Sequence, residues 1–471
     1  MTPFSFYWHD YETFGVVPRR DRPAQFAGVR TDADLNEIEA PLTLYCQPAA
    51  DLIPDPAACL ITGITPQVCA ERGVRERDFA DAIEAQLARP GTVGCGYNSL
   101  RFDDEVTRFL FWRNLLDPYA REWQNECGRW DLLDTVRCAW ALRPDGIEWP
   151  TRDEGKPSFR LEHLTAANGL AHEAAHDALS DVRATIALAR LVKDKQPKLW
   201  AHCLKLHKKQ AVIDEMGVGR PFLHLSGRYA VERGCMAVVW PLAPHPKFKN
   251  EVIVWDLAFD PRELFALDAK TVRERLFTAV AALPPGQTRL PIKTIHLNKS
   301  PIVIGNLKAL GAAATRWGID VDQALRHAEV AARQANSMAG IWPEVYTRVP
   351  PSEPIDVDED LYGGFLDNED RRALQRLRAL PADRLAERRP AFSDPRLGEL
   401  LLRFRARNHP DTLSAAEREH WLGQCRLHWQ QAPEWFERIT ALEVTADERG
   451  RGLLAELRRW AAAKQSQDAP P

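Results

Sequence analysis

Three clusters of acidic residues lie between residues 10 and 181, at spacings that could serve metal chemistry. Asp10 and Glu12 are two residues apart at the end of a strand-like stretch, so both side chains project from one face of that strand. Two carboxylates placed in this way can bind a hard divalent cation through their oxygens. An isolated Asp-x-Glu is more often a solvated turn pair, so these two residues alone do not decide between the roles.

The other two clusters lie at the starts of helix-like segments. Asp103 to Glu105 follow an apolar strand-like run and open a helix-like stretch, a junction that often carries functional groups. Acids at this position also cap helices, which is the simpler role. His176 precedes another helix-like segment, and Asp181 falls within its first turns. A histidine beside a helical carboxylate can act as a general base next to a metal ligand, although such pairs also occur by chance.

The conjunction of the three clusters says more than any one of them. They occur in order within one segment of alternating strands and helices, each where its element would direct it toward a common strand-end site. Carboxylates about 4 Å apart repel by roughly 4 kcal/mol per pair at an effective dielectric of about 20. Such a site must hold protons or bind cations, and two Mg²⁺ ions suit phosphoryl transfer. The His176 imidazole, with an ordinary pKa of about 6.5, could accept the proton of an attacking water.

The elements that must position these residues follow an α/β pattern up to about residue 195. Strands are predicted at residues 4–10, 25–31, 42–47 and 92–96, and helices at 78–88, 104–116, 159–168 and 178–192. Alternation of this kind predicts an α/β layered domain. Residues 143–158 are rich in proline, glycine and charge, and we expect a surface loop there.

The pattern changes after residue 200. Short strand candidates at 237–240, 252–257 and 293–297, separated by turn residues, predict a smaller β-rich domain. Residues 349–360 are acidic and contain proline, as linkers do. Residues 361–465 are rich in Arg, Ala, Leu and Glu at helical spacing, which predicts a helical domain.

The composition is that of a globular protein with room for several domains, with 471 residues of which 45% are apolar and 27% charged. Nine cysteines without a Cys-x-x-Cys pair argue against a disulfide framework and a zinc ribbon, so we expect reduced, buried thiols in a cytoplasmic protein. No apolar run reaches the length of a membrane span, and the N-terminus lacks the features of a signal peptide. The net charge of −4 gives no global signature of nucleic-acid binding, so a basic groove would have to be local.

Several stretches carry a resemblance to a known family. Asp10-Tyr-Glu12, Asn98-x-x-x-Phe102-Asp103 and His176-x-x-x-x-Asp181 resemble the three motifs of the DEDDh exonuclease superfamily. Longer stretches resemble the bacterial exodeoxyribonuclease I family, namely residues 9–15, 21–26, 60–67, 101–108, 158–164, 361–365 and 404–408. The resemblance therefore extends over nearly the whole chain.

The resemblance implies both a fold and an activity. The fold would be an α/β ribonuclease-H-like exonuclease domain at residues 1–196, an SH3-like β-barrel domain at 197–350 and an α-helical domain at 355–471. The activity would be 3′→5′ removal of 5′-mononucleotides from single-stranded DNA, in DNA repair and recombination, with two Mg²⁺ ions for which Mn²⁺ can substitute. Asp10, Glu12 and Asp181 would hold the metals, Asp103 would assist the second one, and His176 would be the general base.

Strand binding requires cations for the phosphates and aromatic platforms for the bases. The residues after Asp103 interleave both types, although the aromatic residues could be core and the arginines solvated. By resemblance, the positions that contact DNA are Arg108, Tyr119, Trp123, Arg137 and Arg160, with Glu12 and Thr13 near the terminal nucleotide.

The remaining predictions concern binding partners and alternative functions. The basic run from Arg190 to Lys209 is either solvated surface or a source of phosphate contacts. The family also binds the acidic C-terminal tail of single-stranded DNA-binding protein, for which Arg143 is a candidate, and we expect a monomer without membrane contact. Two alternatives stay open. One is an RNA exonuclease of the same fold, since the chemistry ignores the 2′-hydroxyl, and the other is a catalytically silent nucleic-acid-binding scaffold.

Overall fold

The computed structural model describes residues 4–152, 155–171, 177–334, 338–347, 353–388, 390–430 and 434–467. They belong to two compact units. The first unit combines residues 1–128, 172–186 and 353–471, and the second combines residues 129–171 and 187–352. Each unit is therefore assembled from segments that are distant in the sequence.

The α/β part of the chain is built on a five-stranded sheet with the order β3-β2-β1-β4-β5. Its strands are β1 (Ser5–Thr13), β2 (Pro23–Thr31), β3 (Leu42–Tyr45), β4 (Thr92–Gly96) and β5 (Gly128–Asp131). β2 is antiparallel to β1 and β3, whereas β4 is parallel to β1. The first four strands confirm the predicted ones, and β5 was not predicted.

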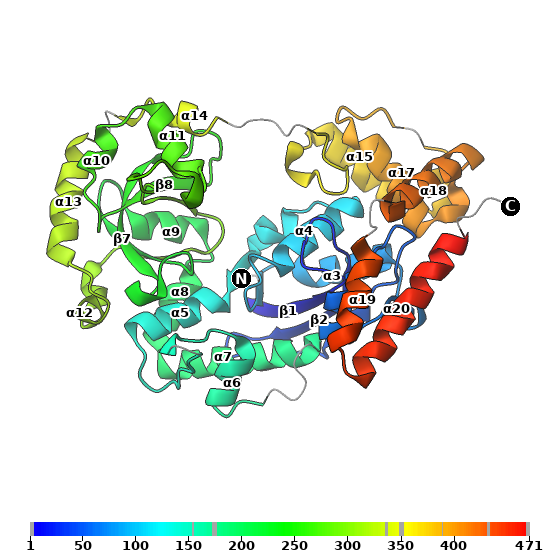
Figure 1. Cartoon of the computed structure of the whole chain (residues 1–471), viewed down its shortest axis with the longest axis horizontal. Helices are drawn as coiled ribbons and strands as arrows, with labels where there is room; N and C mark the ends of the chain where they lie inside the picture. The colour runs from blue at the N-terminus through cyan, green and yellow to red at the C-terminus, as the bar shows by residue number, and fades with distance from the viewer. Residues whose placement is uncertain are drawn as a thin grey trace. The chain divides into compact units, whose positions relative to one another are not determined.

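Helices cover one face of this sheet and leave the acidic residues on the other. Tyr7 and Tyr11 of β1 pack with Phe26 of β2 against Phe79 of α3 (Glu76–Leu87) and Leu110 of α4 (Asp103–Arg113). Figure 1 shows these two helices beside β1 and β2. Because side chains alternate along a strand, the even-numbered residues of β1, including Asp10 and Glu12, project from the opposite face.

The remaining helices of this part are α1 (Pro56–Thr62), α2 (Pro66–Arg72), α5 (Leu132–Leu142), α6 (Leu161–Ala167) and α7 (Ala178–Lys195). α3, α4, α6 and α7 confirm the four predicted helices, with ends that differ by up to three residues. The predicted loop at 143–158 contains no α-helix and no named strand over residues 143–152 and 155–158, which are its described part, but Thr151 and Pro157 form an isolated β-bridge.

The second unit contains an antiparallel sheet with the order β10-β6-β7-β8-β9. Its strands are β6 (Phe222–Leu225), β7 (Met236–Pro244), β8 (Glu251–Asp256), β9 (Ile292–His296) and β10 (Ile302–Ile304), of which β7, β8 and β9 were predicted. Its helices are α8 (Pro197–Lys205), α9 (Lys209–Met216), α10 (Arg262–Phe265), α11 (Ala269–Phe277), α12 (Ala313–Arg316), α13 (Val321–Gln334) and α14 (Trp342–Val345).

The C-terminal region is helical, as predicted. It comprises α15 (Asn368–Arg378), α16 (Ala382–Ala386), α17 (Arg396–Asn408), α18 (Ala415–Gln430), α19 (Glu434–Thr445) and α20 (Glu448–Gln467). Trp435, Ile439 and Leu457 of the last two helices share a buried cluster with Cys59 of α1 and with Ile64. The end of the chain is thus part of the same hydrophobic core as residues near its beginning.

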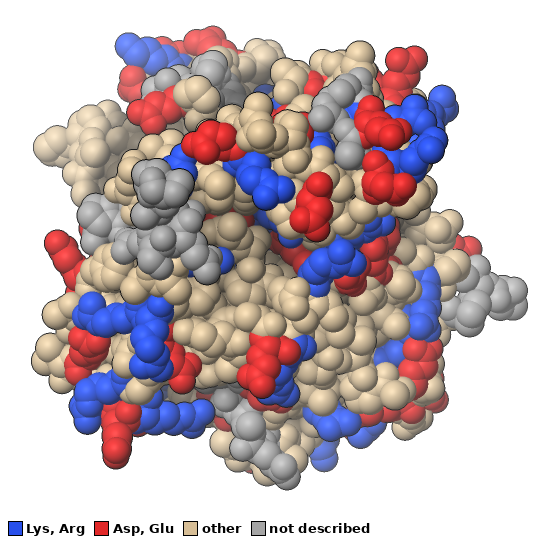
Figure 2. Space-filling view, turned by 90° about the vertical axis from the view of Figure 1, so that its right-hand side faces the viewer, with Lys and Arg blue, Asp and Glu red and all other residues tan. Residues whose placement is uncertain are grey.

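The prediction of reduced, buried thiols is confirmed. All nine cysteines are buried, and none of them forms a disulfide. No helix in the described part of the chain combines the length and the apolar character that a membrane span requires. On the face drawn in Figure 2, basic and acidic side chains lie interspersed rather than gathered into one large basic patch.

A buried ion cluster joins the exonuclease-like segment to the C-terminal helices. Arg407 of α17 pairs with Asp51 at 2.7 Å and also with Asp358, and Arg22 pairs with Asp51 at 2.7 Å. The Arg407 and Asp51 side chains are each 1% exposed. Burial alone would raise the pKa of Asp51, but the charges of Arg407 and Arg22 outweigh it and lower that pKa well below its usual range.

We expect Asp51→Ala to lower the free energy of unfolding of this unit by about 3–5 kcal/mol, because it leaves two buried arginines with Asp358 as their one shared carboxylate in this cluster. Since the depressed pKa stabilises the fold above the ordinary value of about 4, this contribution disappears as the pH falls below that value. Urea unfolding at pH 7 and pH 3, followed by tryptophan fluorescence, measures both effects. Arg438→Ala, which breaks a pair whose arginine is 51% exposed, is the control and should cost much less.

Candidate active site

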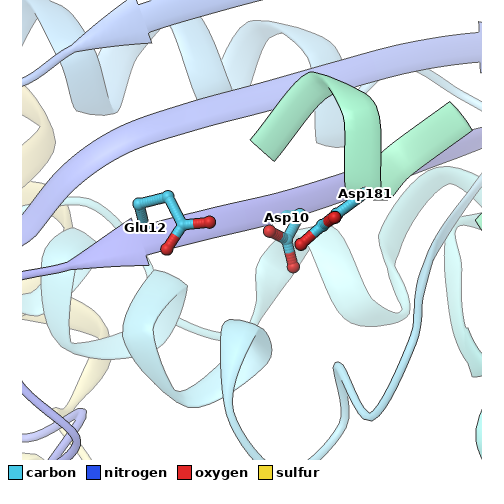
Figure 3. A group of neighbouring side chains, drawn as sticks. All are labelled: Asp10, Glu12 and Asp181. Carbon is cyan, nitrogen blue, oxygen red and sulfur yellow. The ribbon is translucent and has the colours of Figure 1, made fainter. Parts of the chain in front are cut away.

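Asp10, Glu12 and Asp181 form a compact acidic group. Asp10 and Glu12 project from β1, and Asp181 comes from the first turns of α7 and points toward Asp10 (Figure 3). One carboxylate oxygen of each residue lies within 4.8 Å of the other two, and within the described ranges this is the one cluster of three or more potential ligands that meets this limit. Oxygen donors are the ligands that Mg²⁺ and Mn²⁺ prefer. The three residues therefore fit a hard divalent cation.

The pKa values of these carboxylates also indicate a cation site. Burial, followed by the charges of Asp10, Asp181 and Asp177, raises the pKa of Glu12 to about 9. Burial, followed by Asp103, Asp181 and Asp177, also raises the pKa of Asp10 well above its ordinary range. Without a cation, the site must therefore keep protons on carboxylates that would otherwise be ionised at neutral pH.

Asp103 begins α4 beside this group, outside the set of three. Its Oδ1 accepts the backbone N–H of Tyr11 at 3.1 Å, and the residue is 2% exposed. The next residue, Asp104, accepts a hydrogen bond from Arg121 at 2.5 Å, with both side chains buried. The first turn of α4 is thus fixed by β1 through Asp103 and by a buried ion pair through Asp104.

The turn between β4 and α4 explains the residues that precede Asp103. A Cβ atom at Gly96 would lie 2.9 Å from the carbonyl oxygen of His9 and 2.7 Å from the Cβ of Ser99, so a larger residue would force the strands apart. Asn98 has a φ of 63°, in the left-handed region that asparagine tolerates better than most residues. The Asp104 N–H then donates to the Ser99 carbonyl at 2.9 Å and closes the turn.

His176, the predicted general base, lies outside the described residues. Asp177, which follows it, is described and was not predicted as a site residue. Its Oδ2 accepts the backbone N–H of Ser180 at 3.2 Å, so it caps α7, and its charge contributes to the raised pKa of both Asp10 and Glu12. An acid directly before a helix is common, and nothing in the sequence pattern set Asp177 apart from an ordinary cap.

Arg108, a predicted DNA contact, is already engaged by protein groups. Its guanidinium donates to Glu122 at 2.7 and 2.9 Å, to Glu105 at 2.9 Å and to the hydroxyl of Tyr362 at 3.0 Å. The residue is 5% exposed, and its guanidinium lies over the ring of Tyr119 at 5.2 Å. Its contact with a strand remains a prediction.

The predicted aromatic contacts are more open. Trp123 is 67% exposed. The Tyr119 ring lies 6.1 Å from that of Phe365, which sequence reasoning did not single out and which is 85% exposed. Such rings can stack with bases. Phe365 belongs to a stretch quoted for its family resemblance, and only its position beside Tyr119 marks it as a candidate contact.

Thr13 lies with the acidic group in the first unit, and two predicted contacts belong to the second unit. The Thr13 hydroxyl donates to the carbonyl of Gly15 at 2.6 Å, just after the register shift between Glu12 and Thr13 in the β1–β2 pairing. Arg137 donates to Asp134 at 2.6 Å, whereas the Arg160 side chain is 63% exposed and lies 3.7 Å from Glu162. Arg160 thus has the freer guanidinium of the two.

Comparison with known proteins matches three ranges that together cover most of this chain. Family models described as "Exonuclease", "Exonuclease I SH3-like domain" and "Exonuclease I C-terminal domain" match residues 7–189, 207–348 and 355–464. Exodeoxyribonuclease I of Escherichia coli is 44% identical over 422 residues, which cover 89% of this chain and 88% of that protein.

Solved structures agree over nearly the full length. A moderately thermophilic exonuclease I from Methylocaldum szegediense has a TM-score of 0.93 and 48% identity, covering 98% of this chain and 99% of that one. E. coli exonuclease I in complex with a dA16 oligonucleotide has a TM-score of 0.92 and 41% identity, covering 98% and 100%. Similar structures include a zinc-bound E. coli complex with single-stranded DNA and a complex of SSB with exonuclease I and an inhibitor.

The acidic site, the helical C-terminal region and these matches lead to one conclusion: the chain belongs to the exonuclease I family.

Proposed function

We propose that this chain removes 5′-mononucleotides from the 3′ end of single-stranded DNA through the site on β1, α4 and α7. The observation that carries the proposal is the convergence of three carboxylate oxygens within 4.8 Å, in a chain whose relatives are named exodeoxyribonuclease I. A binding scaffold would not need buried acids whose pKa values are raised by burial and, further, by their mutual repulsion. An RNA exonuclease is less well supported, because a similar solved structure holds a DNA oligonucleotide.

Each carboxylate has a part in this mechanism. Asp10, Glu12 and Asp181 hold divalent cations, for which we propose two Mg²⁺ ions, with Mn²⁺ as a substitute, and Asp103 assists the second one. When bound there, the cations stabilise the charge of the attacking and leaving oxygens of the phosphodiester. His176 accepts the proton of the attacking water. Asp103 and Asp181 are carried by helices rather than by loops. Because helices are rigid, these carboxylates can keep their geometry during turnover.

Several residues besides the metal ligands would contact the strand. We propose that the terminal nucleotide lies near Glu12 and Thr13, and that Tyr119, Trp123 and Phe365 offer rings to the bases. Arg137 and Arg160 supply charge for phosphates, and Arg108 does so only if the strand displaces a carboxylate partner. We retain domain boundaries at residues 1–196, 197–350 and 355–471, which the matched ranges support. We further propose a cytoplasmic monomer that acts in DNA repair.

A pocket in the second unit suits the acidic tail of single-stranded DNA-binding protein. It has a volume of about 400 Å³. Its basic lining residues are Arg143, Lys198 and His202, and its apolar ones include Leu142, Pro197, Leu199 and Ile304. Arg143 donates to the carbonyl of Ala309, another lining residue, at 3.0 Å, which restrains its guanidinium beside the pocket. Cations beside an apolar pocket fit a peptide that ends in a hydrophobic residue and a carboxylate.

We expect Asp10→Ala to lower the turnover number by about three orders of magnitude, because it removes charge stabilisation worth several kcal/mol. His176→Ala should slow turnover about 10²- to 10⁴-fold, as loss of a general base does, while Mn²⁺ still binds. The assay follows a 5′-labelled and a 3′-labelled single-stranded oligonucleotide with Mg²⁺ and with EDTA, together with calorimetric Mn²⁺ titration. Full activity of Asp10→Ala would contradict the assignment of the metal site.

Metal binding should depend on pH with a defined sign. Because the pKa of Glu12 is raised to about 9 in the folded protein, a cation must displace a proton at neutral pH, and its apparent affinity should rise with pH until about 9. For the same reason the metal-free protein should lose stability as the pH rises from about 5 to 9, because carboxylates that repel one another become ionised. Calorimetry in two buffers of different ionisation enthalpy measures the protons released, and unfolding curves with EDTA or Mg²⁺ test the second effect. An affinity that is independent of pH between 6 and 9 would refute this account.

Arg143→Ala should weaken binding of an acidic C-terminal peptide at least about tenfold, since one well-placed charged hydrogen bond is worth about 1.5–3 kcal/mol. Cleavage of a naked oligonucleotide should not change. Fluorescence anisotropy with a labelled peptide measures the affinity. Arg326→Ala on α13, an exposed arginine of the same unit, serves as the control. Equal loss in both variants would mean that the peptide responds only to overall charge.

A further inference from the structure

Gln25 is a buried polar residue directly beside the acidic group. It belongs to β2, is 2% exposed, and pairs with Glu12 in the β1–β2 register. Directly opposite residues of neighbouring strands project to the same face of a sheet. The Gln25 side chain therefore lies on the face that carries Asp10 and Glu12, where a buried carboxamide needs hydrogen-bond partners.

Those partners lie on β3 and at the start of α7. The Gln25 Oε1 accepts the backbone N–H of Ala178 at 3.4 Å, and its Nε2 donates to the Asp177 carboxylate at 3.5 Å. Nε2 also donates to the hydroxyl of Tyr45 at 3.1 Å. Donor and acceptor of one carboxamide are thus both directed at the first residues of α7, and Tyr45 fixes the side chain from β3.

Asp177, which accepts the hydrogen bond of Gln25, is also bonded to Asp181 through the backbone. Asp177 caps α7 through Ser180, and its backbone carbonyl accepts the N–H of Asp181 at 3.0 Å. A shift of Asp177 and Ala178 would therefore move Asp181 with them, because a helix turn is stiff. Another polar contact of this helix, Arg183 with Glu37, has side chains that are 53% and 40% exposed, and solvent weakens such a pair.

We propose that Gln25 is a positioning residue of the nuclease site, which sets the distance of Asp181 from Asp10 and Glu12 by holding the start of α7 against β2. This inference rests on the proposed metal site and adds a residue to it. Gln25 contacts neither the cation nor the strand in this proposal. It acts through Asp177, Ala178 and the first turn of α7, as the hydrogen-bonding partners behind metal ligands commonly do.

The experiment compares Gln25→Met and Gln25→Ala with the wild type. Methionine retains most of the buried volume and removes both hydrogen bonds to α7, whereas alanine also leaves a cavity. Loss of a partner behind a metal ligand commonly costs about 10- to 100-fold in metal affinity or activity, so we expect a loss of this size in both variants. Mn²⁺ affinity is measured by calorimetry without DNA, and the Mg²⁺ concentration for half-maximal cleavage is measured on a single-stranded oligonucleotide.

The matched control is Gln67→Ala, which removes a carboxamide hydrogen bond of 2.6 Å to the Glu456 carbonyl and does not touch the acidic group. It should shift the thermal midpoint without changing Mn²⁺ affinity. If Gln25→Met keeps wild-type Mn²⁺ affinity and Mg²⁺ dependence, or loses stability alone as the control does, the positioning role is refuted. If the wild type itself shows no metal-dependent cleavage and Asp10→Ala changes nothing, the proposed function fails instead.

Discussion

Mutual repulsion among carboxylates is the constraint on which the rest of this structure depends. Asp10, Glu12, Asp103 and Asp181 come from one strand and two helices, and Asp177 adds a fifth charge nearby. Left to themselves these groups would separate, so the elements that carry them must be held from outside the site. The aromatic cluster beneath β1 and β2 does this from the opposite face of the sheet. The fold therefore stabilises an arrangement that is locally unfavourable until cations bind.

Each element that bears a ligand is fixed in its own way. β1 is paired on both sides, with β2 and β4. α4 is held by the tight turn at Gly96 and by the buried pair of Asp104 with Arg121. α7 meets the sheet through the carboxamide of Gln25. The three elements that carry the acids are thus held by contacts of different kinds, namely strand pairing, a buried ion pair and the hydrogen bonds of a carboxamide.

Much of this could be predicted from the sequence, because periodicity reveals which face of an element is buried. The strand ending in Asp10-Tyr-Glu12 and the helix beginning at Asp103 were placed within three residues, and their acids meet as expected. Other features depend on register and distant contacts. Gln25 gains its meaning only from its position opposite Glu12, and the sequence does not reveal that Glu122 and Tyr362 bind the Arg108 guanidinium. β5 was not predicted, because a strand of four residues, Gly-Arg-Trp-Asp, is too short to show an alternating pattern.

The buried ion cluster of Asp51 with Arg407 also has a consequence for the order in which the protein is made. The two residues are separated by 356 positions. At a synthesis rate of about 5–20 residues per second, Asp51 leaves the ribosome roughly 20–70 s before its partner. During that interval, Arg22 is the one partner of Asp51 in this cluster that has been synthesised, while Asp358 and Arg407 are still missing. Completion of the nuclease unit is therefore tied to completion of the whole polypeptide, so that truncated products of translation lack the contacts that finish its core.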